Sequence, residues 1–276
     1  MEIDKMLWLI KAPARALLSG IGLAVHKIKR EPYQELWEVP RFTDHTVRLL
    51  DRPFKIADSR SFFFSYREIF VEQIYRFNTC STVPRIIDCG SNYGTSIVYF
   101  KSIYPGARIT GIEADPKIFS YLTENCSHLE VDLLNKCVSQ NNDPLRFFSE
   151  GSDGGRAAHA LDEPKAVVQV ETVTLDDLID GHVDFLKIDI EGSEGDSLEA
   201  CTKLSMVDQM FVEYHSFKDA DQTLGRMLNK LSSQGFRYYI HEQFCSPRPL
   251  TQEVLQLGMD LQLNIFAKRP VPSNSE

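Results

Sequence analysis

From residue 84 onward, short apolar runs alternate with stretches whose apolar residues recur at helical spacing. The runs are typical of buried strands, and they stand at 85–89, 107–113, 131–138, 183–189 and 209–214. The helical stretches lie between or after them, at 94–104, from Pro116 onward, at 194–204 and at 220–234. This alternation predicts an α/β fold in which parallel strands form one sheet and helices cover it.

An insertion interrupts the alternation, and the pattern changes near the C-terminal end. Residues 145–148 and 167–173 have strand-like patterns within the insertion, and 174–178 predicts a cap followed by one short helix. Residues 236–244 and 261–267 predict two strands with no strong helical pattern between them. We expect this last pair to be antiparallel and to close a mostly parallel sheet.

An aromatic-rich stretch precedes the first of these strands. Within it, Ile69, Gln73 and Phe77 share one face of a predicted helix. The favoured interpretation is a helix that packs against the sheet. The alternative is a lid over a ligand pocket, in which Tyr66 and Glu68 supply the polar contacts.

The N-terminal arm differs in charge from the rest of the chain. Residues 1–30 carry an apolar stripe at helical spacing and a net charge of +4, whereas the whole chain carries −9. Charged residues and glycines interrupt the stripe, which argues against a transmembrane span, and the acidic start argues against a signal peptide. We expect a short helix and a linker over 31–60. The predicted divisions are a helical arm, a main domain and a tail, at 1–60, 61–270 and 271–276.

Two interpretations of the arm stay open. Its helix packs on its own domain or on a second copy of the chain as a homodimer contact. Alternatively, residues 1–30 lie as a basic amphipathic helix on an anionic membrane surface. Flotation with lipid vesicles separates the two.

The overall composition narrows the partners and the compartment. The net charge of −9 disfavours broad binding to nucleic acid, which needs clustered Lys and Arg. Six scattered cysteines show no metal-ligand spacing, and Cys89 and Cys137 lie inside apolar runs, where buried free thiols are expected. We therefore expect a reducing compartment and a cytoplasmic protein, with peripheral attachment to the inner membrane surface as the alternative.

The most informative motif stands where the first strand ends. Residues 88–94, with the sequence Asp-Cys-Gly-Ser-Asn-Tyr-Gly, connect that strand to a helix. A tight turn at a helix N-terminus is the usual place for a nucleoside-containing ligand in such sheets. Nineteen residues past Gly94, the second strand ends at Glu113, an acid at the position that holds a ribose diol. The spacing predicts a nucleoside-binding site.

The residues of this turn select among nucleoside cofactors. Asn92 occupies the place where a dinucleotide site needs a glycine for close approach to the pyrophosphate, which disfavours an NAD-linked oxidoreductase. S-adenosylmethionine (SAM) has no phosphate, and its ammonium group suits Asp88. The antiparallel closing pair is also typical of the class I methyltransferase form of the Rossmann-like sheet. We therefore predict SAM as the cofactor.

Several segments of the chain resemble the FkbM-type methyltransferases, namely 66–70, 87–94, 111–116, 174–178, 184–194 and 211–215. The most specific run is Leu-Lys-Ile-Asp-Ile-Glu-Gly-Ser-Glu at 186–194, although the family usually carries a bulky aromatic where this chain has Ser193. The resemblance implies a class I methyltransferase fold and SAM-dependent O-methylation of a hydroxyl on a sugar, glycolipid or secondary metabolite. The candidate cofactor contacts are Asp88, Gly90, Ser91, Asn92, Gly94, Glu113, Ala114 and Asp189.

The chemistry of methyl transfer points to a second group of residues. An alcohol is a weak nucleophile, so a base or a metal has to assist the loss of its proton. Four candidate catalytic residues lie at two neighbouring strand tips, and these are Asp189, Glu191, Glu213 and His215. His215, whose unperturbed pKa is about 6.5, is the preferred general base. Asp189 orients this base or holds the methionine ammonium.

Other roles for the same side chains stay open. Glu191 and Glu194 suit acceptor hydroxyls, but Glu194 opens a helix, where an acid stabilises the positive end. A Mg²⁺ site built from Asp189, Glu191 and Glu213 is the less favoured alternative to a metal-free site. Arg156 either lines an acceptor pocket or is solvated. For the whole chain, the alternative to an enzyme is a catalytically silent methyltransferase-like module that binds a partner.

Overall fold

The computed structural model describes residues 31–149, 155–157 and 167–270. The chain divides into two compact units, residues 1–36 and residues 37–276. In the first unit the description begins just before a 3₁₀ helix, η1 (Gln34–Glu38). The predicted arm helix and the tail at 271–276 lie outside the described residues. Among the helices that are described, none is long and apolar enough to cross a membrane.

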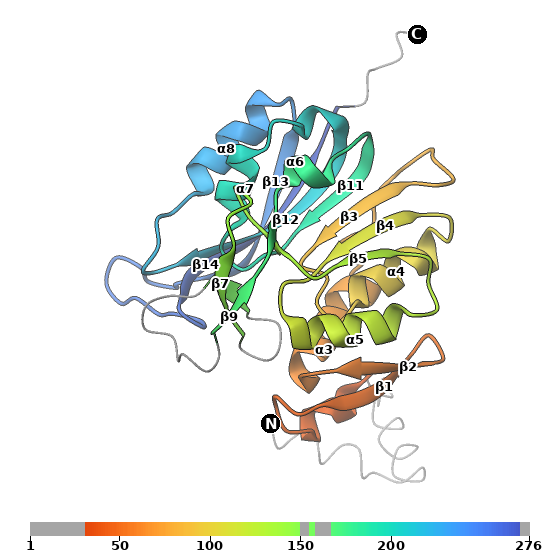
Figure 1. Ribbon diagram of the computed structural model, residues 1–276. Coiled ribbons are helices and arrows are strands. Elements are labelled where there is room, and N and C mark those ends of the chain that lie inside the picture. Colours follow the sequence, from red (N-terminus) through yellow and green to blue (C-terminus); the bar gives the residue numbers. More distant parts are fainter. Residues whose placement is uncertain (1–30, 150–154, 158–166, 271–276) are drawn as a thin grey trace, which may run out of the picture. The chain divides into compact units, whose positions relative to one another are not determined.

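A seven-stranded sheet runs through the second unit (Figure 1). Its spatial order is β13-β14-β12-β11-β3-β4-β5. The strands are β3 (Arg85–Cys89), β4 (Arg108–Ile112), β5 (Asp132–Leu134), β11 (Val183–Ile188), β12 (Val207–Phe217), β13 (Arg237–Cys245) and β14 (Met259–Lys268). Neighbours are parallel from β12 to β5, whereas β14 runs antiparallel to both β12 and β13. The predicted fold class, a mostly parallel Rossmann-like sheet with an antiparallel closing pair, is confirmed.

The helices follow the strands in the predicted alternation. They are α4 (Thr95–Ile103), α5 (Pro116–Cys126), α6 (Leu175–Leu178), α7 (Glu194–Ala200) and α8 (Leu224–Ser233). Asp115 caps α5, and Thr174 forms a capping box with Asp177 at α6. The helix predicted to reach residue 204 ends at Ala200, because Cys201 adopts an extended backbone. A separate 3₁₀ turn, η4 (Leu204–Met206), follows.

The core forms two apolar layers on opposite faces of the sheet. The central strand β11 is buried at all six positions, and successive side chains point to opposite faces. Leu186 and Ile188 join a layer with Leu198 of α7 and Met227 of α8. Phe185 joins the layer that packs under α4 and α5. Full burial of each such side chain contributes about 1.5–3 kcal/mol, so helices on both faces hold the strand tips in fixed positions.

The predicted third strand is two strands in the structure, and that prediction was wrong. β5 pairs with β4, whereas β6 (Cys137–Val138) leaves the main sheet and pairs with β10 (Thr172–Val173). Between them, the side chain of Asn135 donates to the carbonyl oxygens of Glu113 and Ala114, at 2.8 and 3.1 Å. These bonds hold the chain beside the tip of β4, where it turns out of the sheet.

The insertion forms a small sheet of its own. β7 (Leu145–Phe148) pairs with β8 (Arg156–Ala157) and with β9 (Val167–Val170), both antiparallel. The strand-like patterns predicted β7 and β9. Most of the Gly-rich loop ahead of β8 lies outside the described residues.

Residues 45–56 form a hairpin, and the prediction of a linker there was wrong. β1 (His45–Leu49) pairs antiparallel with β2 (Arg52–Ile56). The turn between them places Leu50 and Asp51 at φ of +43° and +64°. Two left-handed residues give the twist that tight hairpins favour, but Asn and Gly usually supply them. The ordinary sequence signal for a hairpin is therefore absent.

The aromatic stretch is helical but shorter than predicted. α3 (Ser59–Tyr66) continues into one π-helical turn, η2 (Arg67–Val71). Asp58 caps α3 by accepting two backbone N–H bonds. Helix geometry stops before Gln73, whose φ is +57°, so Phe77 does not lie on the predicted helical face. The favoured interpretation holds in its main point, because the segment contributes to the apolar layer under α4.

Candidate active site

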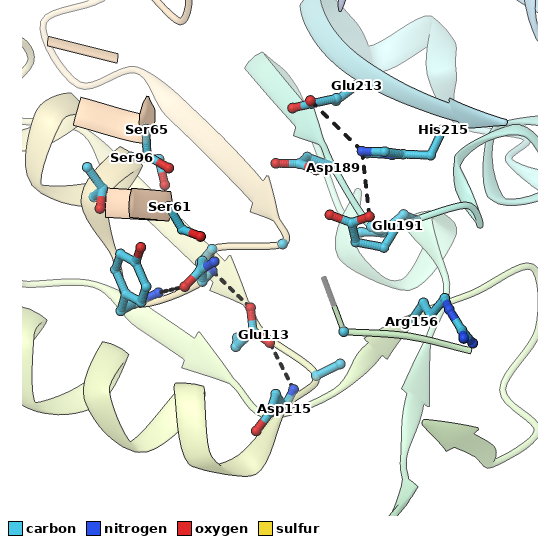
Figure 2. A pocket seen from close by; sticks show the side chains of 18 of the residues that line it. Ser61, Ser65, Ser96, Glu113, Asp115, Arg156, Asp189, Glu191, Glu213 and His215 are labelled. Carbon is cyan, nitrogen blue, oxygen red and sulfur yellow. Dashed lines mark hydrogen bonds and ion pairs between the residues drawn. The ribbon is translucent and has the colours of Figure 1, made fainter. Parts of the chain in front are cut away.

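A cavity of about 680 Å³ opens where β3, β4, β11 and β12 end. Figure 2 shows Glu113 on one side of it and the side chains of Asp189, Glu191, Glu213 and His215 on the other. The predicted site residues that line it are Gly90, Ser91, Asn92, Glu113, Ala114, Asp189, Glu191, Glu213 and His215. Parallel strands bring their carboxyl ends to one edge of a sheet, which is why residues so far apart in sequence meet here.

The turn after β3 is shaped by a close approach to β11. Gly90 has a φ of +82°, and a Cβ atom there would lie 1.8 Å from the carbonyl oxygen of Asp189. The N–H groups of Gly90 and Ser91 both donate to the carbonyl oxygen of Ile112, at 2.9 Å each. Asn92 has a φ of +48°, and its side-chain oxygen accepts the next backbone N–H at 2.7 Å. Only glycine fits the first position.

Two predicted cofactor contacts lie behind this turn and do not line the cavity. Asp88 is fully buried, accepts a hydrogen bond from Ser96 and lies 3.3 Å from the ammonium of Lys187. A Cβ atom on Gly94 would approach Cys126 of α5 at 2.8 Å. Neither residue therefore faces the ligand space as the sequence led us to expect: Asp88 stabilises the strand tips, and Gly94 lets α4 pack closely on α5.

Glu113 ties the tip of β4 to the turn after β3. Its carboxylate accepts the backbone N–H of Asn92 at 2.9 Å and that of Asp115 at 2.8 Å. Burial, helped by repulsion from Asp115, raises the pKa of Glu113 to about 7 despite these two hydrogen bonds. A carboxylate at this position faces the cavity and can accept hydrogen bonds from a diol.

Lys187 is a central residue of the site and was not among the predicted site residues. It lies in β11 and is 2% exposed. Its ammonium group donates to the carbonyl oxygen of Gly90 at 2.7 Å and pairs with Asp88 and Asp189 at 3.3 and 3.2 Å. Burial alone would lower the pKa of Lys187, but the two carboxylates outweigh it and raise that pKa. A lysine in the middle of the mostly apolar strand β11 was the available signal.

His215 lies within β12, which extends beyond the predicted strand, and a buried carboxylate orients its ring. Its Nδ1 atom lies 3.0 Å from Oε1 of Glu194. Glu194 is fully buried and also accepts the backbone N–H groups of Ile190 and Gly192 at 3.0–3.1 Å. It stabilises the loop between β11 and α7, does not line the cavity, and is not placed to bind an acceptor.

The Nε2 atom of His215 faces the cavity among carboxylates. It lies 3.6 Å from Glu191 and 3.9 Å from Glu213 (Figure 2). Burial alone would lower the pKa of His215, but Glu191 and Glu194 outweigh it and raise that pKa well above its ordinary value. Burial and repulsion from Asp189 raise the pKa of Glu213 to about 8, against the attraction of His215. The raised pKa of His215 favours the protonated, cationic imidazole, which opposes the predicted action of His215 as a base.

The aromatic segment and the insertion supply the outer wall. Glu68 lines the cavity, and burial together with repulsion from Asp189 raises its pKa to about 7. Tyr66 does not line it, because its ring stacks on Phe70 with 5.1 Å between centroids. Arg156 of β8 also lines the cavity (Figure 2). Of the two polar contacts considered for a lid, only Glu68 faces the ligand space.

One group of side chains in the described part of the chain has the geometry to hold a metal ion. Asp189, Glu191 and His215 each offer one ligand atom, and these atoms lie within 4.8 Å of one another. The set differs from the one considered on sequence, because His215 takes the place of Glu213.

Comparison with known proteins agrees with this architecture. The chain matches the model of the methyltransferase FkbM domain over residues 88–238, more than half of its length. "Methyltransferase sdnD" from Sordaria araneosa is 36% identical over 62 residues, 22% of this chain and 24% of that protein. "Methyltransferase 1" from Beauveria bassiana (strain ARSEF 2860) is 25% identical over 221 residues, 70% of this chain and 88% of that protein.

One solved structure that this chain matches is methyltransferase FkbM from Methylobacillus flagellatus KT. It is 18% identical with a TM-score of 0.45, over 69% of this chain and 45% of that one. This chain therefore spans less than half of the Methylobacillus and Sordaria proteins. The family match runs from the end of β3 to the start of β13 and includes the polar residues at the ends of β11 and β12. The chain belongs to the FkbM methyltransferase family.

Proposed function

We propose that this chain is a SAM-dependent methyltransferase that methylates a hydroxyl of a sugar, glycolipid or secondary metabolite. Family membership supports methyl transfer. The observation that carries the rest is a single cavity with two chemically different walls. One wall has a nucleoside-type turn paired with Glu113, and the other has the carboxylates and the imidazole of β11 and β12.

The first wall suits the cofactor. Ser91, Asn92 and Ala114 line the space beside Glu113, whose carboxylate accepts the two ribose hydroxyls in the proposed complex. Asp189, at the end of β11, keeps its carboxylate partly accessible beside the turn, and its negative charge attracts the methionine ammonium. Asp88 acts only indirectly, through Lys187, because it is enclosed.

The second wall suits a hydroxyl acceptor. The acceptor oxygen forms a bond to the methyl carbon while the carbon–sulfur bond breaks and its electron pair goes to sulfur, leaving S-adenosylhomocysteine. The hydroxyl proton goes to the carboxylate of Glu213, which lies 3.9 Å from His215 beside the cavity. Glu191, on the same side (Figure 2), aligns the acceptor. Alignment and proton removal are the two contributions that this displacement needs.

We place the reaction in a reducing compartment, the cytoplasm. All six cysteines lie in the described part of the chain, and all are free. Four of them are buried, where a thiol behaves as a small apolar side chain.

Calorimetry with S-adenosylhomocysteine tests the cofactor assignment. We expect wild-type protein to bind it and Glu113→Ala to bind at least about tenfold more weakly, since a charge-assisted hydrogen bond contributes about 1.5–3 kcal/mol. Glu124→Ala, which removes a surface acid of α5 paired with Lys55, is the matched control. No binding by wild-type protein, or equal binding by Glu113→Ala, contradicts the assignment.

Transfer of a labelled methyl group from SAM into a lysate of the native host tests the reaction. We expect one labelled product whose methyl group is an ether on a former hydroxyl. Binding of S-adenosylhomocysteine without any labelled product favours the alternative, a catalytically silent binding module. A label found on nitrogen or carbon contradicts O-methylation.

A further inference from the structure

The side chains at the ends of β11 and β12 converge on one point in the cavity. The ligand atoms of Asp189, Glu191 and His215 lie within 4.8 Å of one another. Nitrogen and oxygen ligands sit about 2.0–2.2 Å from a divalent ion, so atoms that share one ion lie at most about 4.4 Å apart. The Nε2 atom of His215 and the carboxylate of Glu191, 3.6 Å apart, already lie within that limit, and the remaining separations have to shorten for the three side chains to share one ion.

The orientation of the imidazole is a second and independent observation. A metal-binding histidine usually donates its other ring N–H to a carboxylate, which fixes the tautomer and aims the free nitrogen at the metal. His215 has this arrangement, because its Nδ1 atom lies 3.0 Å from Oε1 of Glu194, an oxygen that already acts as an acceptor for two backbone N–H groups. Glu194 is itself held by the backbone N–H groups of Ile190 and Gly192. The ring is thus fixed by a fully buried group.

The Nε2 atom is left pointing at ligand space without a close acceptor. Its distances to Glu191 and Glu213, 3.6 and 3.9 Å, exceed a hydrogen bond. The amide nitrogen of Gln262 lies within hydrogen-bond distance of Nε2, at 3.4 Å, and also donates to Glu213. His215 is 4% exposed, so its partners have to come from the protein or from a ligand in the cavity.

The charge around this point also favours a cation. Asp189, Glu191 and Glu213 all line the same part of the cavity, and Glu68 lies close enough to repel Asp189 and Glu213. Lys187 shares its charge between Asp88 and Asp189. Carboxylates gathered in a half-buried pocket repel one another strongly, and a divalent ion at their centre relieves that repulsion.

We propose that Asp189, Glu191 and His215 bind a divalent cation, with Glu194 as the residue that positions His215. Carboxylate oxygens together with one imidazole suit a first-row transition ion such as Mn²⁺ or Zn²⁺ better than Ca²⁺. The binding of the ion is independent of the function proposed above, but its role rests on that function.

In the proposed reaction an ion held by Asp189, Glu191 and His215 would act as a Lewis acid that lowers the pKa of the acceptor hydroxyl. The acceptor oxygen forms the bond to the methyl carbon, the carbon–sulfur bond breaks towards sulfur, and the hydroxyl proton goes to the carboxylate of Glu213. Two neighbouring hydroxyls on the acceptor would chelate the ion. The acceptor class that fits this geometry is a vicinal diol of the kind found on sugars.

Direct metal binding tests the site without an acceptor. Full-length protein is stripped with EDTA and titrated with Mn²⁺, free Mn²⁺ is measured by electron paramagnetic resonance, and Zn²⁺ is titrated by calorimetry. We expect one site, weakened at least about tenfold by Glu191→Gln and by His215→Gln, because each removes one ligand. Glu194→Gln is expected to weaken it about 10–100-fold through the orientation of His215. Glu253→Gln, an exposed acid outside the cavity paired with Lys218, is the control and leaves the affinity unchanged.

The outcomes separate this proposal from the proposed function. Wild-type protein that binds neither ion, or binds both as weakly as Glu191→Gln does, overturns the metal site even where S-adenosylhomocysteine binds normally. One Mn²⁺ site in protein that does not bind S-adenosylhomocysteine supports the metal site while the proposed function fails. For the role, labelled methyl transfer in the lysate is expected to stop with EDTA-stripped protein in chelated buffer and to return with Mn²⁺. Equal labelling with and without the ion overturns that role.

Discussion

Lys187 holds the two walls of the cavity together. Its ammonium group contacts the turn after β3 through the carbonyl oxygen of Gly90 and pairs with one carboxylate from each of two neighbouring strands, Asp88 and Asp189. A buried ammonium is tolerated only when it is paired and hydrogen-bonded. These contacts therefore fix the spacing between β3 and β11 at the point where the turn after β3 begins.

Lys187→Met is expected to lower the free energy of unfolding by about 3–5 kcal/mol, because it leaves two carboxylates without their buried partner. Urea denaturation of the purified variant measures this loss. Lys55→Met, which breaks the surface pair with Glu124, is the control and should change stability far less. Similar losses in the two variants would show that the buried ion pairs of Lys187 stabilise the fold no more than a surface ion pair does.

Under the proposed function, Glu113 is expected to make cofactor binding sensitive to pH. Its pKa is raised to about 7, mainly by burial, whereas an unfolded chain has a value of about 4.3. We expect the affinity for S-adenosylhomocysteine to fall as pH decreases below about 7, because a protonated carboxyl accepts fewer hydrogen bonds from the ribose. Calorimetry from about pH 5.5 to about pH 8.5 measures it. Glu113→Gln is expected to bind weakly at every pH; a wild-type affinity that does not change over this range contradicts the assignment.

The raised pKa of Glu113 also predicts that the free energy of unfolding decreases as pH rises, whereas the affinity for S-adenosylhomocysteine is expected to increase. The folded pKa of Glu113 lies above the unfolded value, so the folded chain binds more protons in the window between them. Its contribution to stability is present below about pH 4.3 and is lost as pH rises to about 7. Without ligand, Glu113→Gln should therefore gain thermal stability relative to wild type as pH rises through this window. A constant difference in melting temperature would contradict the raised pKa.

At the scale of elements, the wall formed by α3 depends on one cap. Asp58 is fully buried, caps α3, and accepts the backbone N–H of Phe42 at 2.7 Å. Its carboxylate also pairs with Arg41 at 3.1 Å. The helix that presents Ser61 to the cavity is thereby fastened to the segment that leads into the β1–β2 hairpin. Through this connection, a change in the segment around Arg41 and Phe42 can alter the position of α3 and so the shape of the cavity.

Asp58→Ala is expected to cost about 2–4 kcal/mol of stability, since it removes a helix cap and leaves buried N–H groups unpaired. Thr174→Ala, at the exposed capping box of α6, should cost only about 1 kcal/mol. Chemical denaturation of both variants gives the comparison. Equal losses would mean that the contacts of Asp58 with Arg41 and Phe42 add nothing to the cap.

At the scale of the whole molecule, the site belongs to one of the two units. Among the described residues, those that line the cavity all lie within 37–276. Removal of residues 1–30 is therefore expected to leave the affinity for S-adenosylhomocysteine unchanged, as calorimetry can measure. Flotation with anionic vesicles in parallel assigns the role of the basic arm. Flotation by the full chain and not by the truncated one supports membrane contact, and equal flotation contradicts it.

Much of the fold could be predicted from sequence because its determinants are local. Short apolar runs ended by turns defined the main strands, and Asp115 followed by Pro116 marked the start of α5. The signal failed where local pattern and tertiary pairing diverged, as at Asn135, which turns the chain out of the sheet. The sequence signal also failed at Leu50 and Asp51. Both residues adopt a left-handed backbone, which their residue types do not indicate.

The sequence by itself determined the fold class, the family and the set of polar residues at the strand tips, because strand ends of a parallel sheet must meet at one edge. Only the tertiary structure decided what each residue can reach. It enclosed Asp88 behind the turn, made Lys187 the link between β3 and β11, and aimed His215 into the cavity through Glu194. Burial and ion pairing depend on partners distant in the chain, and no local pattern specifies them.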